Sequence, residues 1–252
     1  GRYAAIQIGA QPVWQPAGWH TAFDGHASLR AQRHRARNKG VAVVEWDRER
    51  ATRNPRLEAC VAQWLARRGM TELHFLVEPE TLGFLEGRRV FVAEREQQPV
   101  GFLLASPVPL RSGWLIEQVI RGNDAPNGSV EMMIDTAVTA MAKDGDQYVT
   151  LGLTPLAQRN VCVENPWWIH PLFALARAHG RRFYNFDGLE CFKAKFRPHH
   201  WEPVYLLSRE RNFSFGTLLA VAGAFTGGRL APAFFGTLIR AVQQELQWLK
   251  RT

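Results

Sequence analysis

The stretch that decides the fold spans residues 113–153, GWLIEQVIRGNDAPNGSVEMMIDTAVTAMAKDGDQYVTLGL. Side chains alternate over 113–121, which predicts a strand, and YVTLGL at 148–153 has the composition of a buried strand. Between them, apolar residues recur at the spacing of an amphipathic helix over 129–143. A strand, a helix and a further strand in this order indicate a mixed α/β sheet.

Further elements are predicted on both sides of this stretch. After it we predict a helix at 167–179, a short strand at 182–186, a helical segment at 189–196 and a last strand at 202–208. Before it we predict strands at 3–9, 41–47, 72–76, 89–95 and 100–108, and helices at 27–39 and 54–68. From residue 89 onward, this order resembles the core of the GNAT acyltransferases. We therefore expect an α/β fold with a mixed sheet, in which residues 1–80 form an incomplete first half and residues 81–209 a second half.

The remaining residues, 210–252, are predicted to form a helical tail. Residues 213–239 carry a single charged side chain, Arg229, but glycines and a proline interrupt the apolar run. Because a membrane span needs about 20 apolar residues without such interruptions, we expect two shorter helices instead. Two placements are open: on a membrane surface, or packed as a pair on the sheet.

The composition restricts the class of partner more than the class of activity. The 252 residues carry a formal net charge of +8 and 46% hydrophobic side chains, which describes a basic globular chain. Such a charge favours nucleic acid, anionic lipid or phosphorylated substrates. The three cysteines and the histidines show no metal-ligand spacing, so we expect no metal site.

One predicted helix is strongly basic. In LRAQRHRARNKG at 29–40, Arg30, Arg33 and Arg37 recur at a spacing that puts them on one helix face with His34. A basic stripe of this kind can bind the phosphates of RNA or of lipid headgroups. The alternative is an ordinary solvated face, but six basic side chains without an acid among them favour binding.

The turn that precedes the central helix is a second candidate site. Asn127 and Gly128 predict a tight turn, with Asn127 or Ser129 as the helix N-cap. The amides of a helix N-terminus attract an anion or a developing oxyanion. Arg121 and Glu131 flank this turn and are candidate site residues, although Glu131 is also explained as a first-turn acid that interacts with the helix dipole.

Two lysines lie within an aromatic, half-apolar segment, NFDGLECFKAKF at 185–196. On a helix, Lys193 and Lys195 point about 200° apart, so they need not share one target. A lysine stem packs readily against aromatic rings, but a buried ammonium without a partner is unstable. We therefore expect at least one of them to meet a phosphate, a carboxylate or a carbonyl oxygen. Asp187 and Glu190 are candidate partners within the segment.

Several of these stretches together resemble one family. RGNDAPNGSVEMMID, YVTLGLTPLA and RFYNFDGLECFKAKFRPHHWEPVYL resemble the synthase domain of the phosphatidylglycerol lysyltransferases, which include the multiple peptide resistance factor proteins. LRAQRHRARNKG and GFLEGRRVFVAEREQQPVGFLLAS match earlier blocks of the same family, so the resemblance covers nearly all of residues 1–209. The family commonly has arginine in the pattern GLRxYKxKF, whereas Glu190 stands at that position here.

The resemblance implies an activity and a location. It implies two GNAT-like halves, aminoacyl-tRNA as the donor, and the hydroxyl of a membrane lipid, phosphatidylglycerol first, as the acceptor. Coenzyme A is not expected, because the loop before the central helix lacks a Gly-x-Gly pattern and contains Asp124 and Pro126. The chain would act in the cytoplasm or at the cytoplasmic face of a bacterial membrane, where changed lipid charge confers resistance to antimicrobial peptides.

Roles for the candidate residues follow from this implied reaction. We expect anion and oxyanion binding from Arg121, Lys193 and Lys195, and amine binding or proton transfer from Glu131 or Asp187. Asn127 and Gly128 would shape the turn, and the basic helix with Arg30, Arg33 and Arg37 would contact tRNA or anionic lipid. Two alternatives stay open: a non-catalytic GNAT-like module that binds anionic membranes or RNA, and a tRNA-dependent transferase with another lipid or a cell-wall precursor as acceptor.

Overall fold

The computed structural model describes residues 3–68, 82–157, 159, 165–179, 185–209, 213–214 and 216–217. One compact unit comprises residues 5–69 and 79–206 and holds most of the described elements, and a second comprises residues 1–4, 70–78 and 207–252. The strand predicted at 72–76 and the helices predicted after residue 217 lie outside the described residues, as do positions 182–184 of the short strand.

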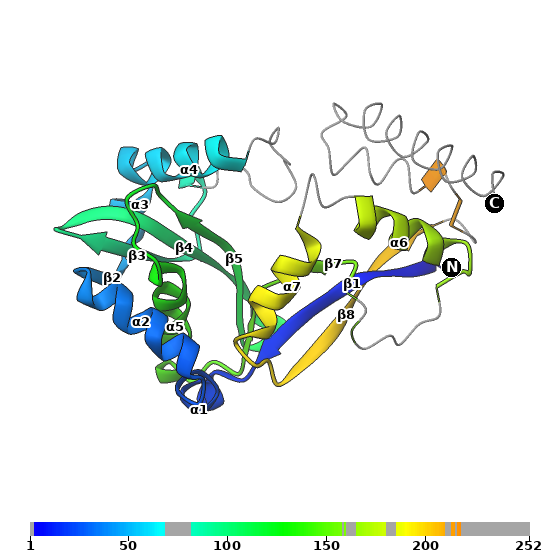
Figure 1. The fold of residues 1–252 in the computed structure, drawn as a ribbon, viewed down its shortest axis with the longest axis horizontal. Coiled ribbons are helices and arrows are strands. Elements are labelled where there is room, and N and C mark those ends of the chain that lie inside the picture. Colours follow the sequence, from blue (N-terminus) through cyan, green and yellow to red (C-terminus); the bar gives the residue numbers. More distant parts are fainter. Residues whose placement is uncertain are drawn as a thin grey trace, which may run out of the picture. The chain divides into compact units, whose positions relative to one another are not determined.

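The strands and helices follow each other along the chain as Figure 1 labels them. The strands are β1 (Ala4–Trp14), β2 (Val41–Trp46), β3 (Arg89–Arg95), β4 (Gln98–Val108), β5 (Gly113–Arg121), β6 (Tyr148–Thr150), β7 (Thr154–Pro155) and β8 (His200–Ser208). The α-helices are α1 (Trp19–Asp24), α2 (Ala27–Asn38), α3 (Arg48–Ala51), α4 (Pro55–Arg68), α5 (Ser129–Lys143), α6 (Ile169–His179) and α7 (Phe186–Ala194). Two short 3-10 helices, η1 (Pro16–Gly18) and η3 (Pro109–Arg111), complete the described elements.

Most predicted elements are confirmed, and three differ in extent or type. The predicted strand 113–121 and helix 129–143 coincide with β5 and α5. The first strand continues to Trp14, well beyond the predicted end, and β6 stops at Thr150 instead of residue 153. Phe186 was predicted to end a strand, which is wrong: it begins α7, because the Asn185 side chain accepts a hydrogen bond from the Gly188 amide and caps that helix.

The eight strands form one mixed sheet in the order β2-β3-β4-β5-β6-β1-β7, with β8 paired to β1. From β2 to β5 the neighbours are antiparallel, β5 and β6 are parallel, and β1 is antiparallel to both β6 and β7. The predicted α/β fold with a mixed sheet is therefore confirmed. Because β2 precedes residue 80 and pairs with β3, the predicted division at that residue passes through a single sheet.

The two faces of the antiparallel strands are covered by different helices (Figure 1). On β3, Phe91 and Ala93 belong to the core that α2 and α5 cover, whereas Val90 and Val92 point to the opposite face and pack with residues of α4. This alternation is the period of two that a strand with two buried faces requires. As a result α5 is held firmly against the sheet, and its N-terminal end lies beside the end of β5 and the middle of α2.

Candidate active site

A pocket of ≈ 290 Å³ lies at the N-terminal end of α5. Its lining comes from α2, from the end of β5 and the loop that follows, from α5 and from α7: Gln32, Arg35, Arg121, Asn127, Gly128, Val130, Glu131 and Phe192. Arg121, Asn127, Gly128 and Glu131 were all predicted as site residues, so the structure brings these four together around one cavity.

Gly128 lies where α5 begins, in direct contact with α2. Its φ is +96°, a conformation that other residues rarely adopt, and it forms the N-cap of α5. A Cβ at this position would lie 2.0 Å from the backbone oxygen of Gln32, so the two helices meet here at backbone distance. The predicted side-chain caps are wrong: Asn127 accepts a hydrogen bond from Arg121, and the Ser129 hydroxyl donates to a carbonyl of the preceding turn.

Arg121, the last residue of β5, folds back over the loop that leads to α5. Its Nε and Nη2 donate to the carbonyl oxygen of Ala125 at 3.1 and 2.8 Å, and Nη2 also donates to Oδ1 of Asn127 at 3.1 Å. Arg121 therefore shapes the loop while it lines the pocket, to which α2 contributes a second guanidinium, that of Arg35. Two cations beside a helix N-terminus make this end of the pocket suitable for an anion.

Lys195 and Glu131 form an ion pair at the pocket. The Lys195 Nζ donates to Oε1 of Glu131 at 2.6 Å, and the side chains are 27% and 12% exposed, respectively. The same ammonium lies 4.2 Å from the centroid of the Phe192 ring and 5.1 Å from that of Phe196. A carboxylate and aromatic faces both stabilise a cation, so the expectation that at least one lysine meets a charged or polar oxygen is confirmed.

The end of α7 that carries Lys195 is fixed by an aromatic cluster. The Trp14 Nε1 donates to the backbone oxygen of Phe196 at 2.9 Å, and the ring of Phe196 stacks on that of Trp19 with centroids 6.0 Å apart. Trp19 in turn donates its Nε1 to the Asp135 carboxylate on α5 at 3.0 Å. The distance between Lys195 and α5 is therefore set by buried aromatic side chains and not by the ion pair alone.

A β-bulge interrupts the pairing along β1. Thr150 of β6 is opposite Val13, and Thr154 of β7 is opposite Ala10, so four steps on one strand match three steps on β1. The extra residue lies in the segment 151–153, where Gly152 has a φ of +70°. Bulges of this kind are frequent next to active sites, because they redirect backbone groups and side chains.

Lys193 binds the backbone at this bulge. Its Nζ donates to the carbonyl oxygens of Gly152 at 2.9 Å and of Leu153 at 2.8 Å, and the residue is only 6% exposed. Burial disfavours the charged form and lowers the pKa of Lys193 from 10.5 to about 7. The lysine thus meets carbonyl oxygens, and the structure does not place it among the residues that line the pocket.

The basic helix α2 has an inner and an outer side. Arg33 points inward, where it donates to the carboxylates of Asp135 and Asp24 at 2.8 Å each, and its side chain is 19% exposed. Arg30 donates to the backbone oxygen of Asp24, whereas Arg37 is exposed. The exposed basic side chains therefore differ from the predicted stripe. They are His34, Arg35, Arg37 and Lys39, and they do not share one helix face, because Arg35 and Arg37 point about 200° apart.

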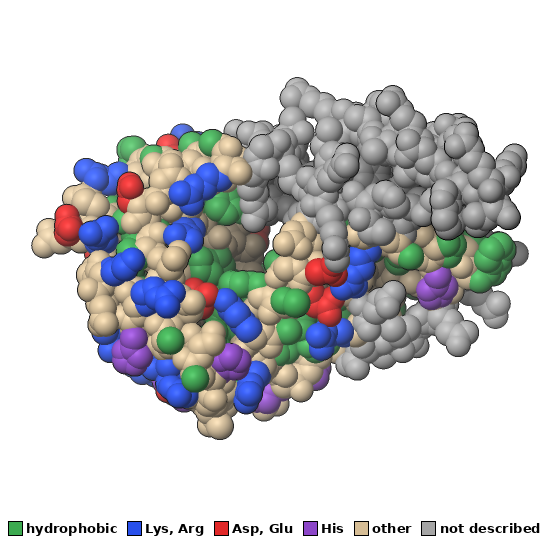
Figure 2. All heavy atoms as spheres, in the orientation of Figure 1, with side chains coloured by type: hydrophobic (Ala, Val, Ile, Leu, Met, Phe, Trp, Pro, Cys, Tyr) green, Lys and Arg blue, Asp and Glu red, His purple; other side chains and the backbone are tan. Residues whose placement is uncertain are grey.

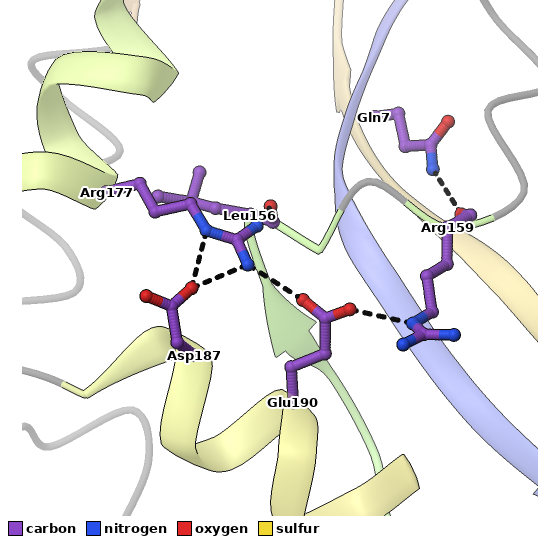
Figure 3. Close-up of polar contacts among 6 residues, drawn as sticks. All are labelled: Gln7, Leu156, Arg159, Arg177, Asp187 and Glu190. Atoms are coloured by element: carbon purple, nitrogen blue, oxygen red, sulfur yellow. Dashed lines mark hydrogen bonds and ion pairs between the residues drawn. The ribbon is translucent and has the colours of Figure 1, made fainter.

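Asp187 and Glu190 pair with arginines that reach α7 from other segments (Figure 3). Arg177 of α6 lies between them and donates to Asp187 at 2.8 Å, to Glu190 at 3.0 Å and to the backbone oxygen of Leu156 at 3.0 Å. Arg159 donates its Nε to the other carboxylate oxygen of Glu190 at 2.7 Å. Glu190 thus connects two guanidinium groups, and the pair of carboxylates anchors the first half of α7.

The charges of the surface agree with a basic chain. Figure 2 shows Lys and Arg side chains distributed over the visible face of the strands and helices around β2–β5, with fewer acidic side chains among them. In the ranges that the structure covers, no group of three or more His, Cys, Asp or Glu side chains is placed to hold a metal ion. Within those same ranges, no helix is long and apolar enough to cross a membrane.

Sequence reasoning missed several residues of the site. Gln32, Arg35, Val130 and Phe192 line the pocket, and the guanidinium groups of Arg159 and Arg177 hold α7. A signal for Arg35 was present: Leu29 and Ala36 are apolar at helical spacing, so they mark the inner side of α2 and leave Arg35 outside. No local pattern indicates Arg159 or Arg177, which reach α7 from other segments.

Solved structures similar to this chain share its fold. A C-terminal domain assigned to a lysylphosphatidylglycerol synthetase of Agrobacterium fabrum superimposes with a TM-score of 0.71 at 22% identity, over 90% of this chain and 68% of that one. The structure of L-PGS from Bacillus licheniformis gives 0.62 at 21% identity, over 93% and 68%. A conserved protein of unknown function from Bacteroides thetaiotaomicron gives 0.55 at 12% identity, over 82% and 61%. The two synthetase structures have a GNAT-like fold, which confirms the predicted fold class.

Sequence comparison identifies the family. A search among curated proteins finds no match. Residues 2–208, however, match the family described as phosphatidylglycerol lysyltransferase, C-terminal, which covers the whole sheet and every residue of the pocket. The activity of this family is a transferase activity in lipid aminoacylation. This chain therefore belongs to the phosphatidylglycerol lysyltransferase C-terminal family.

Proposed function

We propose that this chain transfers an aminoacyl group from aminoacyl-tRNA to the hydroxyl of a membrane lipid, phosphatidylglycerol in the first place. Family membership supports a lipid aminoacyltransferase. The observation that carries the proposal is the pocket at the N-terminal end of α5, where Arg35 and Arg121 lie beside the Lys195–Glu131 ion pair. Such a pocket offers binding to an anion and to an amine within one cavity, and an aminoacyl ester next to a phosphate has both groups.

The reaction requires the protein to bind a phosphate, to stabilise the oxyanion and to bind the amine of the donor. The lipid hydroxyl oxygen attacks the ester carbonyl carbon, its proton leaves, and the carbon–oxygen bond to the tRNA ribose breaks as the ribose oxygen takes up a proton. We assign binding of a phosphate of the donor or the lipid to Arg121 and Arg35, together with the first amides of α5. Lys195 is assigned to the oxyanion that develops on the carbonyl oxygen.

Glu131 is assigned to the amine of the aminoacyl group. Its carboxylate lines the pocket and already holds an ammonium, that of Lys195. Because the amino group of the donor lies next to its own ester, it can take the hydroxyl proton once it has passed its own proton to the Glu131 carboxylate, so no further protein base is required. Asn127 and Gly128 would position the loop, and Asp187 acts through α7 and not on the substrate.

Lys193 receives a different assignment from Lys195. Its Nζ is directed to the Gly152 and Leu153 carbonyl oxygens, so we assign it to fixing the bulge that separates β6 from β7. The exposed arginines of α2, Arg35 at the pocket and Arg37 on another side of the helix, are assigned to phosphates of the tRNA backbone. The donor is an ester and not a thioester, so the proposal requires no coenzyme A, and the acceptor places the chain at a membrane surface.

A transfer assay tests the proposal. Purified protein is incubated with tRNA charged with labelled amino acids and with phosphatidylglycerol vesicles, and the label in the extracted lipid is counted. We expect label in lipid, none after ribonuclease treatment of the donor, and none with phosphatidylcholine vesicles. Lys195→Met should lose the signal, whereas Lys143→Met, at the exposed far end of α5, should keep it.

Absence of label has two distinguishable meanings. If the protein still sediments with phosphatidylglycerol vesicles but transfers nothing, it is a binding module and the proposed function is refuted. If label appears with another lipid or with a cell-wall precursor as acceptor, the transferase class stands and the assigned acceptor is replaced.

A further inference from the structure

We propose that Glu131 and Phe192 form a binding subsite for a primary ammonium group, and that Lys195 occupies this subsite in the free protein. The proposal rests on the proposed function in one respect, namely that the natural ligand is the α-amine of an aminoacyl donor. Lys195 then has two positions: paired with Glu131 when the pocket is free, and displaced toward the anion when an amine has bound.

The contacts around the Lys195 ammonium have the properties of a ligand site. One carboxylate oxygen of Glu131 lies 2.6 Å from Nζ, and the ring of Phe192 lies 4.2 Å away. A carboxylate combined with an aromatic face is the surrounding that cationic ligands prefer. Glu131 and Phe192 both line the pocket, whereas Lys195 itself is not among the lining residues.

The two subsite residues are fixed more firmly than the lysine. Glu131 belongs to the first turn of α5 and its side chain is 12% exposed, against 27% for Lys195. The Phe192 ring packs edge to face against Phe196, with centroids 5.4 Å apart, and Phe196 belongs to the aromatic cluster around Trp19. Lys195 reaches the carboxylate with a flexible four-carbon stem, which can move its charge by several ångströms without moving α7.

An internal cation explains how the carboxylate is tolerated without a ligand. A carboxylate that is largely removed from water is destabilised unless a cation pairs with it. Lys195 supplies this cation, and an incoming ammonium can replace it with no net change of charge at Glu131. The exchange releases the lysine beside Arg121 and Arg35, where a phosphate or an oxyanion needs it. Amine binding and the supply of a free cation are thereby coupled.

The coupling predicts competition, which a simple binding experiment measures. As long as Lys195 holds Glu131, the apparent affinity for an amine is reduced by the fraction of pockets that are closed. The probe is alaninamide, which carries one ammonium group and neither phosphate nor a reactive ester. Its binding to the full chain is measured by isothermal titration calorimetry, with N-acetylalaninamide as the uncharged control ligand.

We expect Lys195→Met to bind alaninamide more tightly than the unmodified chain, by about fivefold if the ion pair has the strength of a partly exposed one. Glu131→Gln should lose binding, and Phe192→Leu should weaken it by about threefold. The control Lys143→Met should bind as the unmodified chain does, and N-acetylalaninamide should not bind. Near-ultraviolet circular dichroism establishes that each variant is folded, and Phe192→Leu provides the test if Glu131→Gln does not fold.

Three results would overturn the proposal: equal or weaker binding by Lys195→Met, unchanged binding by a folded Glu131→Gln, or equal binding of the acetylated ligand. The experiment contains neither tRNA nor lipid, so it separates this inference from the proposed function. If the chain binds alaninamide in this competitive way but transfers nothing, the subsite is supported and the proposed function is refuted. If the chain transfers amino acids but shows no competition, the proposed function is supported and the exchange of Lys195 for the ligand ammonium is refuted.

Discussion

Two lysines at the C-terminal end of α7 have different surroundings. Lys193 contacts the bulge between β6 and β7, and Lys195 contacts the N-terminal end of α5. At the bulge, Lys193 is buried and donates to two uncharged carbonyl oxygens. At α5, Lys195 faces the carboxylate of Glu131 beside an open pocket. Carbonyl oxygens solvate an ammonium without neutralising it, so Lys193 holds the backbone while its own charge remains destabilised by burial. Lys195 instead pairs with a carboxylate that another cation can bind in its place.

The largest expected effect concerns Lys193 and pH. Its pKa is about 7 in the folded chain against the ordinary 10.5, so between these values the unfolded chain binds more protons and stability rises with pH. Below pH 7 both states are protonated and the full cost of the buried charge remains. At about 1.4 kcal/mol per pH unit, the rise over this window is at most about 5 kcal/mol.

Lys193→Met should remove this rise and leave only an offset that does not depend on pH, caused by the two unpaired carbonyls. Urea denaturation of both chains from pH 6 to pH 10 measures the difference in unfolding free energy. If the two stabilities run parallel across this range, Lys193 does not titrate there and the contrast with Lys195 disappears.

The next effect concerns activity. Lys195→Met removes the cation assigned to the oxyanion, so the rate of transfer should fall on the order of 100-fold. Its effect on stability should be smaller, at most about 2 kcal/mol, because the pair is partly exposed. Single-turnover transfer and thermal unfolding measure the two quantities. Activity close to that of the unmodified chain would exclude Lys195 from the site.

A smaller effect tests the anchor that both lysines share. Arg177→Met removes hydrogen bonds to Asp187, Glu190 and the Leu156 carbonyl, and should lower the unfolding free energy by about 2 kcal/mol. Arg159→Met is the matched control, because that side chain is 45% exposed and should contribute less than about 1 kcal/mol. Urea denaturation ranks the two variants, and the reverse order would contradict the assignment of Arg177 as the anchor.

The smallest effect concerns tRNA binding by α2, where Arg33 is paired within the fold and Arg35 and Arg37 are exposed. Replacing Arg35 and Arg37 by alanine should reduce the salt slope of tRNA binding by about 1.5, since each phosphate contact contributes about 0.7–0.9. Arg33→Met should leave the slope unchanged, because its guanidinium is already paired with Asp24 and Asp135. Fluorescence anisotropy in a series of KCl concentrations measures the slopes, and a lowered slope for Arg33→Met would reverse the assignment.

Local sequence patterns were sufficient to predict the elements whose apolar residues recur with the period of a helix or a strand. The helix α5 and the strand β5 were predicted to the residue, because burial on one side imposes a period that the sequence displays. The bulge was not predictable, since it exists only in the register of β6 and β7 against β1. For the same reason β1 was predicted too short: its second half is a strand because of the partners that it meets.

The site was predictable in part. The turn at Gly128 indicated where α5 begins and thereby located Arg121 and Glu131 at one end of a helix. The partner of Lys195 was sought within its own segment, whereas Glu131 lies 64 positions away. Spacing also shows which residues of α2 share a face but not which face is turned inward. Arg33 was therefore predicted to bind tRNA or lipid, whereas it pairs with Asp24 and Asp135 inside the fold.

The pairing of β1 with β6, β7 and β8 has a consequence for the synthesis of the chain. Trp14 donates its hydrogen bond to Phe196, 182 positions later, and Gln7 is held by Asn165, 158 positions later. At roughly 10 residues per second, a ribosome needs about 20 s to deliver these partners after β1 has emerged. During that time β1 is an unpaired strand, open to other chains. Of the described strands β1 is made earliest, yet its partners β6, β7 and β8 all come from residues after 147, so it stays unpaired while they are synthesised.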